Sequence, residues 1–359
     1  MGSAVPSVGL IVNPAAGRDV RRLTGGASVV DNHAKRRVAA CVLDGLTAVA
    51  HDDDRDRDRT LEVRVMPDRA GIADRAIEDA ADAEGLEART LEMPIEGTAA
   101  DTRRAAARFR DAVDAAVVLG GDGTTRDAAA ELGDVPLVAV STGTNNVVPS
   151  AVDGTIAGAA AALVATGAIP GDEVTTRHGI VEARAETPIG ERRLTGLAAA
   201  EVSAQSFVGT RALVDPADLR GGVVSRAHPG DIGLPAVAGA LEPVAPDEPG
   251  GVAVRLADPE TAPRTVRAVL APGVTTTVGV ESVERLEPGE PVRFDVSDGV
   301  VGADGERELE VTDATVDLRP TAAAAGPRLV DVRAALEAGT RVGAFAGDGR
   351  VDSSAAKKK

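Results

Sequence analysis

The chain has 359 residues, a formal net charge of −17, 40 glycines, 4 phenylalanines and neither tryptophan nor tyrosine. So acidic a composition excludes nonspecific binding to nucleic acid, which needs a basic surface, and the single cysteine, Cys41, excludes an internal disulfide. No apolar run reaches the roughly 18 residues of a membrane span and the N-terminus lacks the basic start of a signal peptide, so we expect a soluble cytoplasmic protein of about two domains, without membrane contact.

The first half of the chain alternates short apolar segments with helical ones. Expected strands cover residues 7–13, 61–66, 86–93, 115–119 and 136–140, and expected helices cover 34–50, 70–84, 99–112, 126–132 and 154–166. This alternation predicts a three-layer α/β domain with a parallel sheet over residues 1–170. Right-handed crossovers place the loops that follow the strands on one edge of such a sheet, where ligands bind.

The pattern changes after residue 170. Short β-branched or alternating segments, separated by glycine and proline, follow at 180–185, 193–197, 252–256, 265–270, 275–280, 291–296 and 307–311. They predict a second domain over 171–322, a mainly antiparallel β-sandwich. Residues 323–350 form a C-terminal segment that we expect to return to the first domain with a helix over 327–336, and residues 351–359 are expected to be a disordered tail.

The charged residues are unusual in kind as well as in number. Of 39 basic residues only four are lysines, namely Lys35, Lys357, Lys358 and Lys359. An acidic, lysine-poor chain suits a protein that stays soluble in concentrated salt, because screening there limits charge repulsion to a few ångström. We expect a high-salt cytoplasm. The alternative is a GC-rich genome, which also favours arginine over lysine.

The strongest chemical signal is the segment AVVLGGDGTTRDAA at residues 116–129. A buried strand ends at Gly120-Gly121, and Thr124-Thr125 open a helix. Glycines let backbone N–H groups approach an anion, and a helix N-terminus adds a partial positive charge, so this loop is suited to hold phosphate. It is not a Walker loop, because no Lys-Ser/Thr pair follows it. It is not G-x-G-x-x-G either, because Arg126 stands where the third glycine belongs.

Asp122 lies at the apex of this loop, between Gly121 and Gly123. A carboxylate beside a phosphate site repels the anion and therefore needs another role. It could orient Mg²⁺ or accept the proton of an attacking hydroxyl group. The alternative is an Asp-Gly turn that binds no ligand.

Four motifs in this chain resemble one superfamily of kinases. Gly120–Thr124 resembles the GGDGT signature that joins NAD kinases, diacylglycerol and sphingosine kinases and, more distantly, phosphofructokinases. The segments 13–17 (NPAAG), 142–145 (TGTN) and 304–306 (DGE) are similar to further motifs of that superfamily and occur in the same order. Within it, the chain looks most like the archaeal and bacterial predicted ATP- or polyphosphate-dependent NAD kinases that are related to the acetoin-operon X protein.

This resemblance implies Mg²⁺-dependent transfer of the γ-phosphoryl group of ATP, or of polyphosphate, to a hydroxyl group. The acceptor it implies first is the 2′-hydroxyl of NAD(H), which would yield NADP(H), with Asp122 as the catalytic base. A homo-oligomer formed through the β domain is a further implication, and the metal ligands stay unassigned. The residues it places around nucleotide or substrate are Asn13, Gly17, Gly120, Gly121, Gly123, Thr124, Thr125, Thr142, Gly143, Thr144, Asn145, Glu201 and Glu306.

The chain also departs from NAD kinases. Their Asn-Glu pair, which holds NAD, has Ala200-Glu201 as its nearest counterpart here, so that Glu201 stands in while the asparagine is missing. Their TAYxxSAGGP segment has no counterpart. The acceptor could therefore be another metabolite or lipid hydroxyl, or the protein could be an inactive sensor that only binds nucleotide.

The remaining candidates are less specific. Six basic residues near the first strand could clamp phosphates or form a solvated loop; they are Arg18, Arg21, Arg22, Lys35, Arg36 and Arg37. Four histidines lack metal-binding spacing and are expected to be structural or exposed; they are His33, His51, His178 and His228. A second Gly-Asp-Gly triplet at 347–349 is expected to be a turn.

Overall fold

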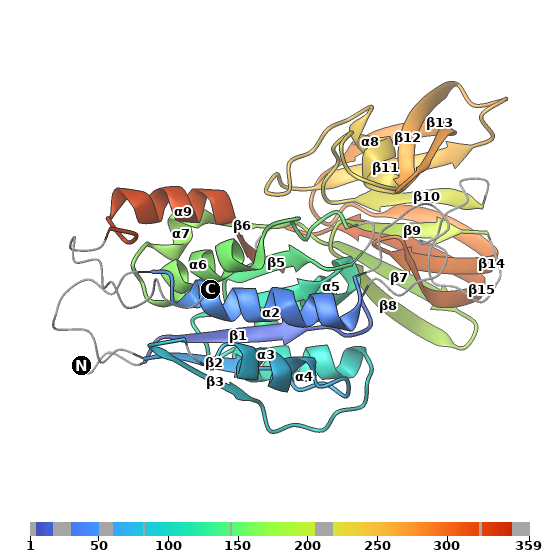
Figure 1. Cartoon of the computed structure of the whole chain (residues 1–359). Coiled ribbons are helices and arrows are strands. Elements are labelled where there is room, and N and C mark those ends of the chain that lie inside the picture. Colours follow the sequence, from blue (N-terminus) through green and yellow to red (C-terminus); the bar gives the residue numbers. More distant parts are fainter. Residues whose placement is uncertain are drawn as a thin grey trace.

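A computed structural model describes residues 5–16, 30–49, 60–81, 83–143, 146–204, 218–322 and 325–346. Three of the predicted site residues, Gly17, Thr144 and Asn145, lie outside these ranges, as do Arg18, Arg21 and Arg22 of the basic group, His51, and the predicted turn and tail at 347–359. The described chain forms two domains, each built on its own sheet (Figure 1). None of the described helices is both long and apolar enough to cross a membrane.

The first sheet has the strand order β3-β2-β1-β4-β5-β16-β6. Strands β1 (Ser7–Val12), β4 (Ala115–Gly120) and β5 (Leu137–Ser141) form its centre, and β2 (Leu61–Val65) and β3 (Leu86–Thr90) extend it on one side. These neighbours all pair in parallel. Every residue of β1 and β4 is buried, which explains their continuous apolar runs, because both faces of the sheet are covered.

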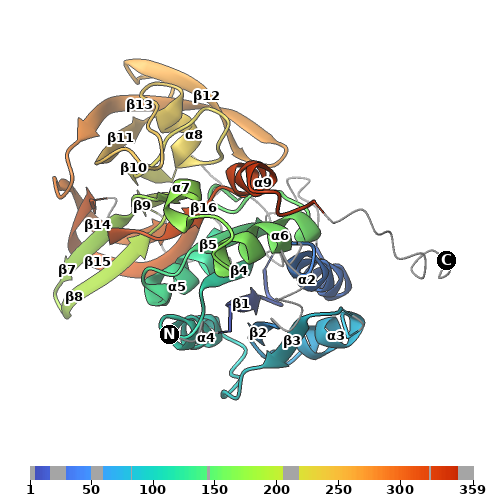
Figure 2. The ribbon, with the colours of Figure 1, turned by 90° about the vertical axis from the view of Figure 1, so that its left-hand side faces the viewer.

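Helices cover both faces of this sheet (Figure 2). Helices α4 (Ala99–Phe109) and α5 (Asp122–Leu132) pack on one face, against Ile11, Ala116 and Val118. The opposite face, with Val8, Leu10 and Val12, is covered by α2 (Asn32–Leu46), α3 (Ile72–Asp79), α6 (Gly154–Ala165) and α9 (Val332–Arg341). The predicted three-layer α/β architecture is therefore confirmed.

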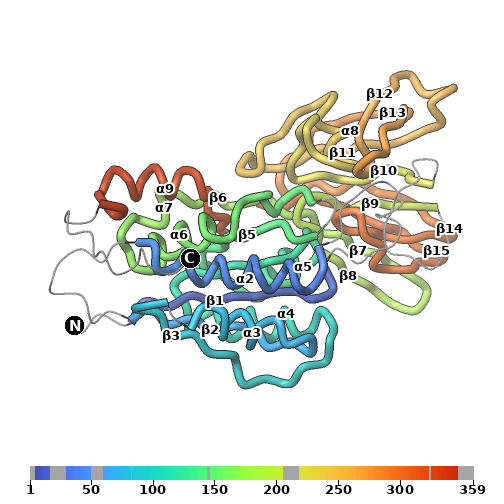
Figure 3. The backbone as a smooth tube through the Cα atoms, in the orientation of Figure 1, coloured from blue at the N-terminus to red at the C-terminus, as the bar shows by residue number. Residues whose placement is uncertain are grey.

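The chain leaves the first sheet through α7 (Gly171–Val174) and β6 (Thr175–Arg177) and comes back at β16 (Arg328–Val330), a path that Figure 3 traces. Strand β16 pairs in parallel with β5 and antiparallel with β6, and α9 then packs on α6. Residues 328–330 are thus a strand, and the prediction of a helix from residue 327 was wrong there. The domain limits at residues 170, 322 and 350 stay predictions.

The second domain is antiparallel, as predicted, and its nine strands form one continuous sheet in the order β12-β13-β11-β10-β9-β14-β15-β7-β8. Strands β10 and β11 also contact β15, so the sheet rolls around a core that includes Val223, Val301 and Val316. Helix α8 (Leu234–Gly239) packs on its other side against β10, β11 and β12. The strands run over β7 (Val181–Thr187), β8 (Gly190–Gly196), β9 (Ala199–Ser203), β10 (Leu219–Val224), β11 (Gly251–Ala257), β12 (Arg264–Ala271), β13 (Val274–Leu286), β14 (Val292–Ala303) and β15 (Glu306–Pro320).

Several elements differ from their predicted bounds. Helix α5 begins at Asp122, four residues before the predicted start at residue 126, so the glycine loop is shorter than expected. Helix α3 ends at Asp79, and β14 and β15 are 12 and 15 residues long because their alternation continues through charged residues on an exposed face. Strands β9 and β10 and helix α8 were not predicted.

Candidate functional site

Strands β1 and β4 are neighbours at the point where the strand order of the first sheet reverses, and the loops that follow them meet there. Asn13, directly after β1, donates its backbone N–H to Leu119 O at 3.1 Å. Its side-chain Nδ2 donates to Thr124 Oγ1 at 2.8 Å, and its Oδ1 accepts the N–H of Ala15 at 2.8 Å. The predicted Asn13 and Thr124 are therefore in direct contact, at the crevice where open α/β sheets bind ligands.

Gly120, which ends β4, and Gly121, directly after it, are needed for close packing. A Cβ on Gly120 would lie 2.5 Å from Thr124 Cβ, and one on Gly121 would lie 2.8 Å from Asn146 Oδ1. Gly121 is the N-cap of α5, and its carbonyl accepts the hydroxyl of Thr125 at 3.0 Å. The N-terminus of α5, with its partial positive charge, therefore opens at the sheet edge beside Asn13.

The loop after β5 packs against the same glycines. Thr142 donates its backbone N–H to Gly120 O at 2.9 Å, and a Cβ on Gly143 would lie 3.2 Å from Gly121 Cα. Within the described residues, Thr142 Oγ1 and Asn146 Oδ1 are buried without a hydrogen-bond partner. Three predicted loops thus converge, although the structure does not describe Thr144 and Asn145.

Asp122 is the first residue of α5 and only 4% exposed. Its Oδ2 accepts the N–H of Val147 and its Oδ1 accepts the N–H of Val148, each at 2.8 Å. The carboxylate therefore fixes the loop after β5 against the start of α5. This orienting role was not predicted for Asp122 and is compatible with a chemical one.

The predicted DGE segment is a tight hairpin turn between β14 and β15. Ala303 pairs with Glu306, and both residues between them have positive φ, 54° at Asp304 and 77° at Gly305, as in the turns that favour Asp-Gly. The Asp304 carboxylate accepts the backbone N–H groups of Leu197, Ala198 and Ala199 at 2.7 to 3.1 Å. It therefore holds the segment that leads into β9.

Arg126 connects the two domains. Its Nη1 lies 3.4 Å from Asp304 Oδ2 and donates to Ala303 O at 3.2 Å, and its Nη2 lies 2.5 Å from Glu308 Oε1. Burial opposes its charge, but Asp304 and Glu308 outweigh burial and hold the pKa of Arg126 above its ordinary value. Sequence reasoning noted Arg126 only as a departure from G-x-G-x-x-G. Its position one helical turn after Asp122 was the available signal.

The two predicted glutamates differ in position. Glu306 reaches across the domain junction, since a Cβ on Gly123 would lie 3.3 Å from Glu306 Oε2. Glu201, on β9, is 2% exposed, and its Oε1 accepts the N–H of Gly305 at 2.9 Å while its Oε2 has no partner within the described residues. Burial, and then the charge of Asp304, raise the pKa of Glu201 to about 8. Glu201 is therefore mostly protonated at neutral pH and supports the turn that carries Glu306.

The basic group near β1 does not form one phosphate clamp among its described members. Lys35 is fully buried, and its Nζ donates to Pro14 O at 2.8 Å and to Ala16 O at 2.7 Å. Arg36 pairs with Asp79 at 2.5 Å. Lys35 thus stabilises the turn after β1 through its carbonyl groups, a role that sequence reasoning missed.

Whether Mg²⁺ fits this site depends on the oxygen donors that the side chains offer. Within the described ranges, no three histidine, cysteine, aspartate or glutamate side chains gather in a way that could hold a metal. Mg²⁺ commonly uses only one or two carboxylates and completes its shell with water and substrate phosphates. Asp122, at the start of α5, and Glu306, which reaches Gly123, are carboxylates of the kind that this shared mode of binding uses.

Comparisons with known proteins agree with this two-part architecture. Residues 8–169 match the family of the ATP-NAD kinase N-terminal domain, and residues 181–323 match the acetoin catabolism protein X C-terminal domain. The match of the first half confirms the predicted kinase superfamily and identifies the chain as an enzyme of the phosphotransferase class.

Two solved structures align with most of this chain, both at low identity and with TM-scores below 0.5. Yeast NADH kinase, solved in complex with NADH, has a TM-score of 0.49 and 11% identity over 98% of this chain and 91% of its own. A putative diacylglycerol kinase from Bacillus anthracis has a TM-score of 0.41 and 13% identity over 91% of this chain and 98% of its own.

A curated relative matches most of the chain. Acetoin catabolism protein X of Cupriavidus necator is 37% identical over 311 residues, which cover 85% of this chain and 84% of that protein. With a kinase-type first domain and a matching second domain, this chain belongs to the acetoin catabolism protein X family.

Proposed function

We propose that the protein is a kinase that transfers the γ-phosphoryl group of ATP to a hydroxyl group, with the 2′-hydroxyl of NAD(H) as the first candidate acceptor. The observation that carries this proposal is the meeting of two carboxylates at one helix N-terminus. Asp122 starts α5 in the first domain, and Glu306 of the second domain reaches Gly123 in the next position. Phosphate binding alone gains nothing from either charge, whereas proton transfer and metal binding need them.

The proposed step is an in-line displacement. The acceptor oxygen forms a bond to the terminal phosphorus, the bond from that phosphorus to the bridging oxygen breaks, and ADP leaves with the electron pair. Asp122 accepts the hydroxyl proton, and its amide hydrogen bonds from Val147 and Val148 hold the carboxylate in place for it. Glu306 is the alternative base, because its carboxylate lies close to Gly123 in the same helix turn.

The surrounding residues would bind and orient the donor. The backbone N–H groups at the start of α5 would hold phosphate oxygens, and Asn13 and Thr124 would fix the turn beside them through their 2.8 Å contact. With Asp122 as the base, Glu306 and the phosphates of the donor would hold Mg²⁺, which would neutralise charge on the transferred group. Inorganic polyphosphate is the alternative donor, since only its phosphates need to be recognised.

The identity of the acceptor molecule has less support than the phosphoryl transfer itself. The kinship of residues 8–169 with ATP-NAD kinases favours NAD(H). The missing asparagine beside Glu201 and the burial of the Glu201 side chain speak for another small-molecule hydroxyl. Because both oxygens of Asp122 accept backbone N–H groups, a sensor that binds nucleotide without turnover is the second candidate.

The deciding experiment is an acceptor screen. Protein in molar KCl with Mg²⁺ and ATP or polyphosphate is offered NAD⁺, NADH and a panel of nucleosides, vitamins and lipids, and products are identified by mass spectrometry. We expect NADP(H) from the wild type and none from Asp122→Ala. A different phosphorylated product would retain the kinase and replace the acceptor. ATP binding without any product would refute catalysis and favour the sensor.

We also propose that the protein works in a high-salt cytoplasm and assembles through its second domain. The net charge of −17 supports the first point, because like charges repel less when salt screens them. Circular dichroism melts should show loss of structure when KCl falls from molar to millimolar concentration. An unchanged melting temperature would refute the salt requirement, and light scattering would report a monomer if the assembly is wrong.

A further inference from the structure

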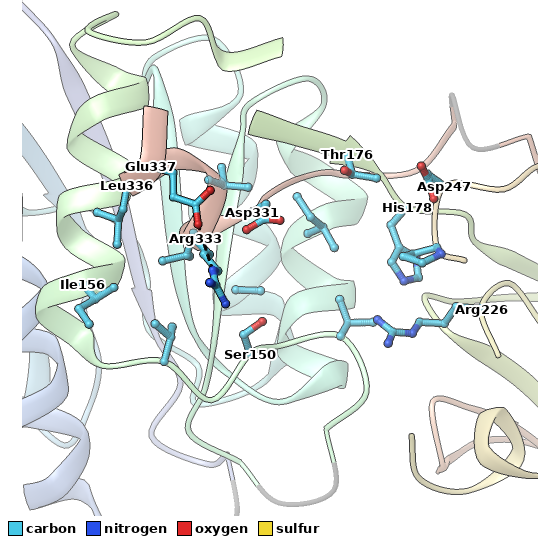
Figure 4. A pocket seen from close by; sticks show the side chains of 17 residues that line it. Ser150, Ile156, Thr176, His178, Arg226, Asp247, Asp331, Arg333, Leu336 and Glu337 are labelled. Atoms are coloured by element: carbon cyan, nitrogen blue, oxygen red, sulfur yellow. Dashed lines mark hydrogen bonds and ion pairs between the residues drawn. The ribbon is translucent and has the colours of Figure 1, made fainter. Parts of the chain in front are cut away.

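A cavity lies behind the loop that holds Asp122. It has a volume of about 750 Å³, within the usual range for small-molecule sites, and lies between the first sheet, α9 and the second domain. Apolar side chains make up about half of its walls, with Val148, Val152, Ile156, Leu329 and Leu336 among them. Figure 4 shows Ile156 and Leu336 toward one end and His178 and Arg226 toward the other.

His178 brings an unmet hydrogen-bond acceptor to this cavity. The side chain lines the cavity and the residue is only 1% exposed. Nδ1 lies 2.6 Å from Gly179 O, and because a carbonyl can only accept, Nδ1 carries the proton. Nε2 is then an acceptor, and it has no partner within the described residues. Burial, aided by the charge of Arg226, lowers the pKa of His178 to about 4, so the ring is neutral at physiological pH.

The charged groups of the cavity are already engaged. Arg226 is bound by both oxygens of Asp231, at 2.9 and 3.2 Å, and Arg333 pairs with Glu337 at 3.1 Å. Asp331 caps α9 by accepting the N–H of Ala334 at 3.0 Å. Asp247, at the rim, adds a further negative charge. Each arginine that lines the cavity thus has a carboxylate partner among the described residues, so the cavity favours an uncharged ligand over nucleotide or polyphosphate.

We propose that this cavity binds a small uncharged organic molecule that has an apolar body and a hydroxyl or N–H donor. The apolar body lies along Val152, Leu329 and Leu336, and the donor forms the hydrogen bond that His178 Nε2 lacks. An unpaired buried acceptor is costly, so a ligand with a donor is favoured over one of the same shape without it.

The position of the cavity links it to the proposed active site. Val148 lines the cavity, and its backbone N–H holds Asp122 Oδ1 at 2.8 Å. Ser150, which also lines it, extends β5 through hydrogen bonds with Ala139 and Ser141. A ligand in the cavity therefore contacts the same loop, residues 146–150, that positions Asp122 from its other side.

The test uses 2-naphthol as the probe and 2-methoxynaphthalene, which lacks the donor, as its matched control. The chain has no tryptophan or tyrosine, so naphthol fluorescence anisotropy is read without protein emission. We expect the wild-type protein to bind 2-naphthol at least about tenfold more tightly than the methoxy compound, as one satisfied buried hydrogen bond allows. On binding, amide hydrogen exchange in residues 146–150 should slow.

Variants assign the site. His178→Phe keeps a ring but no acceptor and should bind both probes equally, whereas His228→Phe, the same change at an exposed histidine, should behave as the wild type. Ser150→Phe, which fills the cavity from an exposed position, should lose both probes. Absence of naphthol binding, equal wild-type affinity for the two probes, or unchanged naphthol affinity in Ser150→Phe would each overturn the proposal. If His178→Phe does not fold, the two-probe comparison and Ser150→Phe still decide.

Discussion

Two buried aspartates, one in each domain, both accept backbone N–H groups, but Asp122 begins helix α5 whereas Asp304 lies in a hairpin turn. Asp122 accepts two backbone N–H groups from the loop after β5, and Asp304 accepts three from residues 197–199. Asp122 lies at the sheet edge, beside Asn13 and the α5 N-terminus, whereas the Asp304 side chain is fully enclosed and paired with Arg126. Both residues are buried, so their positions, and not their exposed fractions, distinguish the proposed chemical role of Asp122 from the structural role of Asp304.

The largest expected effect is a loss of catalytic activity when Asp122 is replaced, because Asp122, but not Asp304, is the proposed catalytic base. Asp122→Ala should lower turnover by about 100- to 10,000-fold, the usual contribution of a positioned general base, and leave ATP affinity within about tenfold. Steady-state kinetics and calorimetric ATP titration measure the two quantities. Asp127→Ala is the matched control, since Asp127 lies on the same helix and pairs with the exposed Arg103. Substantial turnover in Asp122→Ala would assign the base to Glu306 or another group.

The second largest expected effect is a loss of stability when Asp304 is replaced. Asp304→Ala should lower the free energy of unfolding by about 3–5 kcal/mol, because Arg126 would lose a buried partner and three N–H groups would lose their acceptor. Urea unfolding measures this change. Asp298→Ala, at an exposed position on β14, should change it by less than about 0.5 kcal/mol. Equal stability of the two variants would contradict the structural role of Asp304.

The surroundings of Asp304 also predict a pH dependence. The pKa of Glu201 rises from 4.5 to about 8 on folding, so the folded chain binds the extra proton between these values. Its stabilising contribution is complete below pH 4.5 and is lost at about 1.4 kcal/mol per pH unit as the pH rises toward 8. Glu201→Gln should therefore gain stability relative to the wild type over that window, as measured by urea unfolding. Glu310→Gln replaces an exposed glutamate on β15, and its stability should change with pH as that of the wild type does.

His178, which lies away from both aspartates, is expected to cause a smaller pH dependence of stability with the opposite sign to that of Glu201. The pKa of His178 falls from 6.5 to about 4 on folding, so the unfolded chain takes up the proton first. Stability should decrease by about 1.4 kcal/mol per pH unit as the pH drops from 6.5 toward 4. Thermal melts of His178→Phe should lack this component, whereas His228→Phe should keep it. A His178→Phe curve with the wild-type slope would show that another group titrates.

The first domain was predictable because its strands are buried on both faces, so their apolar runs stand out between helices. The second domain was only partly predictable. Strands β9 and β10 read AAEVS and LRGGVV, which are too rich in alanine and glycine to indicate strands. A Cβ on Gly222 would lie 2.2 Å from Ala200 O, so close backbone packing, not strand propensity, selects that glycine.

The same limit applies to the site. The convergence of the loops at Asn13, Gly120 and Thr142 followed from parallel strand order. The bond between Arg126 and Asp304 joins residues 178 positions apart and depends on how the domains meet, which no local pattern records. The burial that raises the pKa of Glu201 is likewise a property of the folded surroundings.

The buried position of Lys35 has a practical consequence. It is the one lysine outside the last three residues of the chain, and its side chain is fully enclosed beneath the turn after β1. Amine-directed reagents such as succinimidyl esters therefore find no lysine side chain to acylate on the folded body between its two ends. Coupling chemistry aimed at amines would therefore leave Lys35 and both proposed binding sites unmodified.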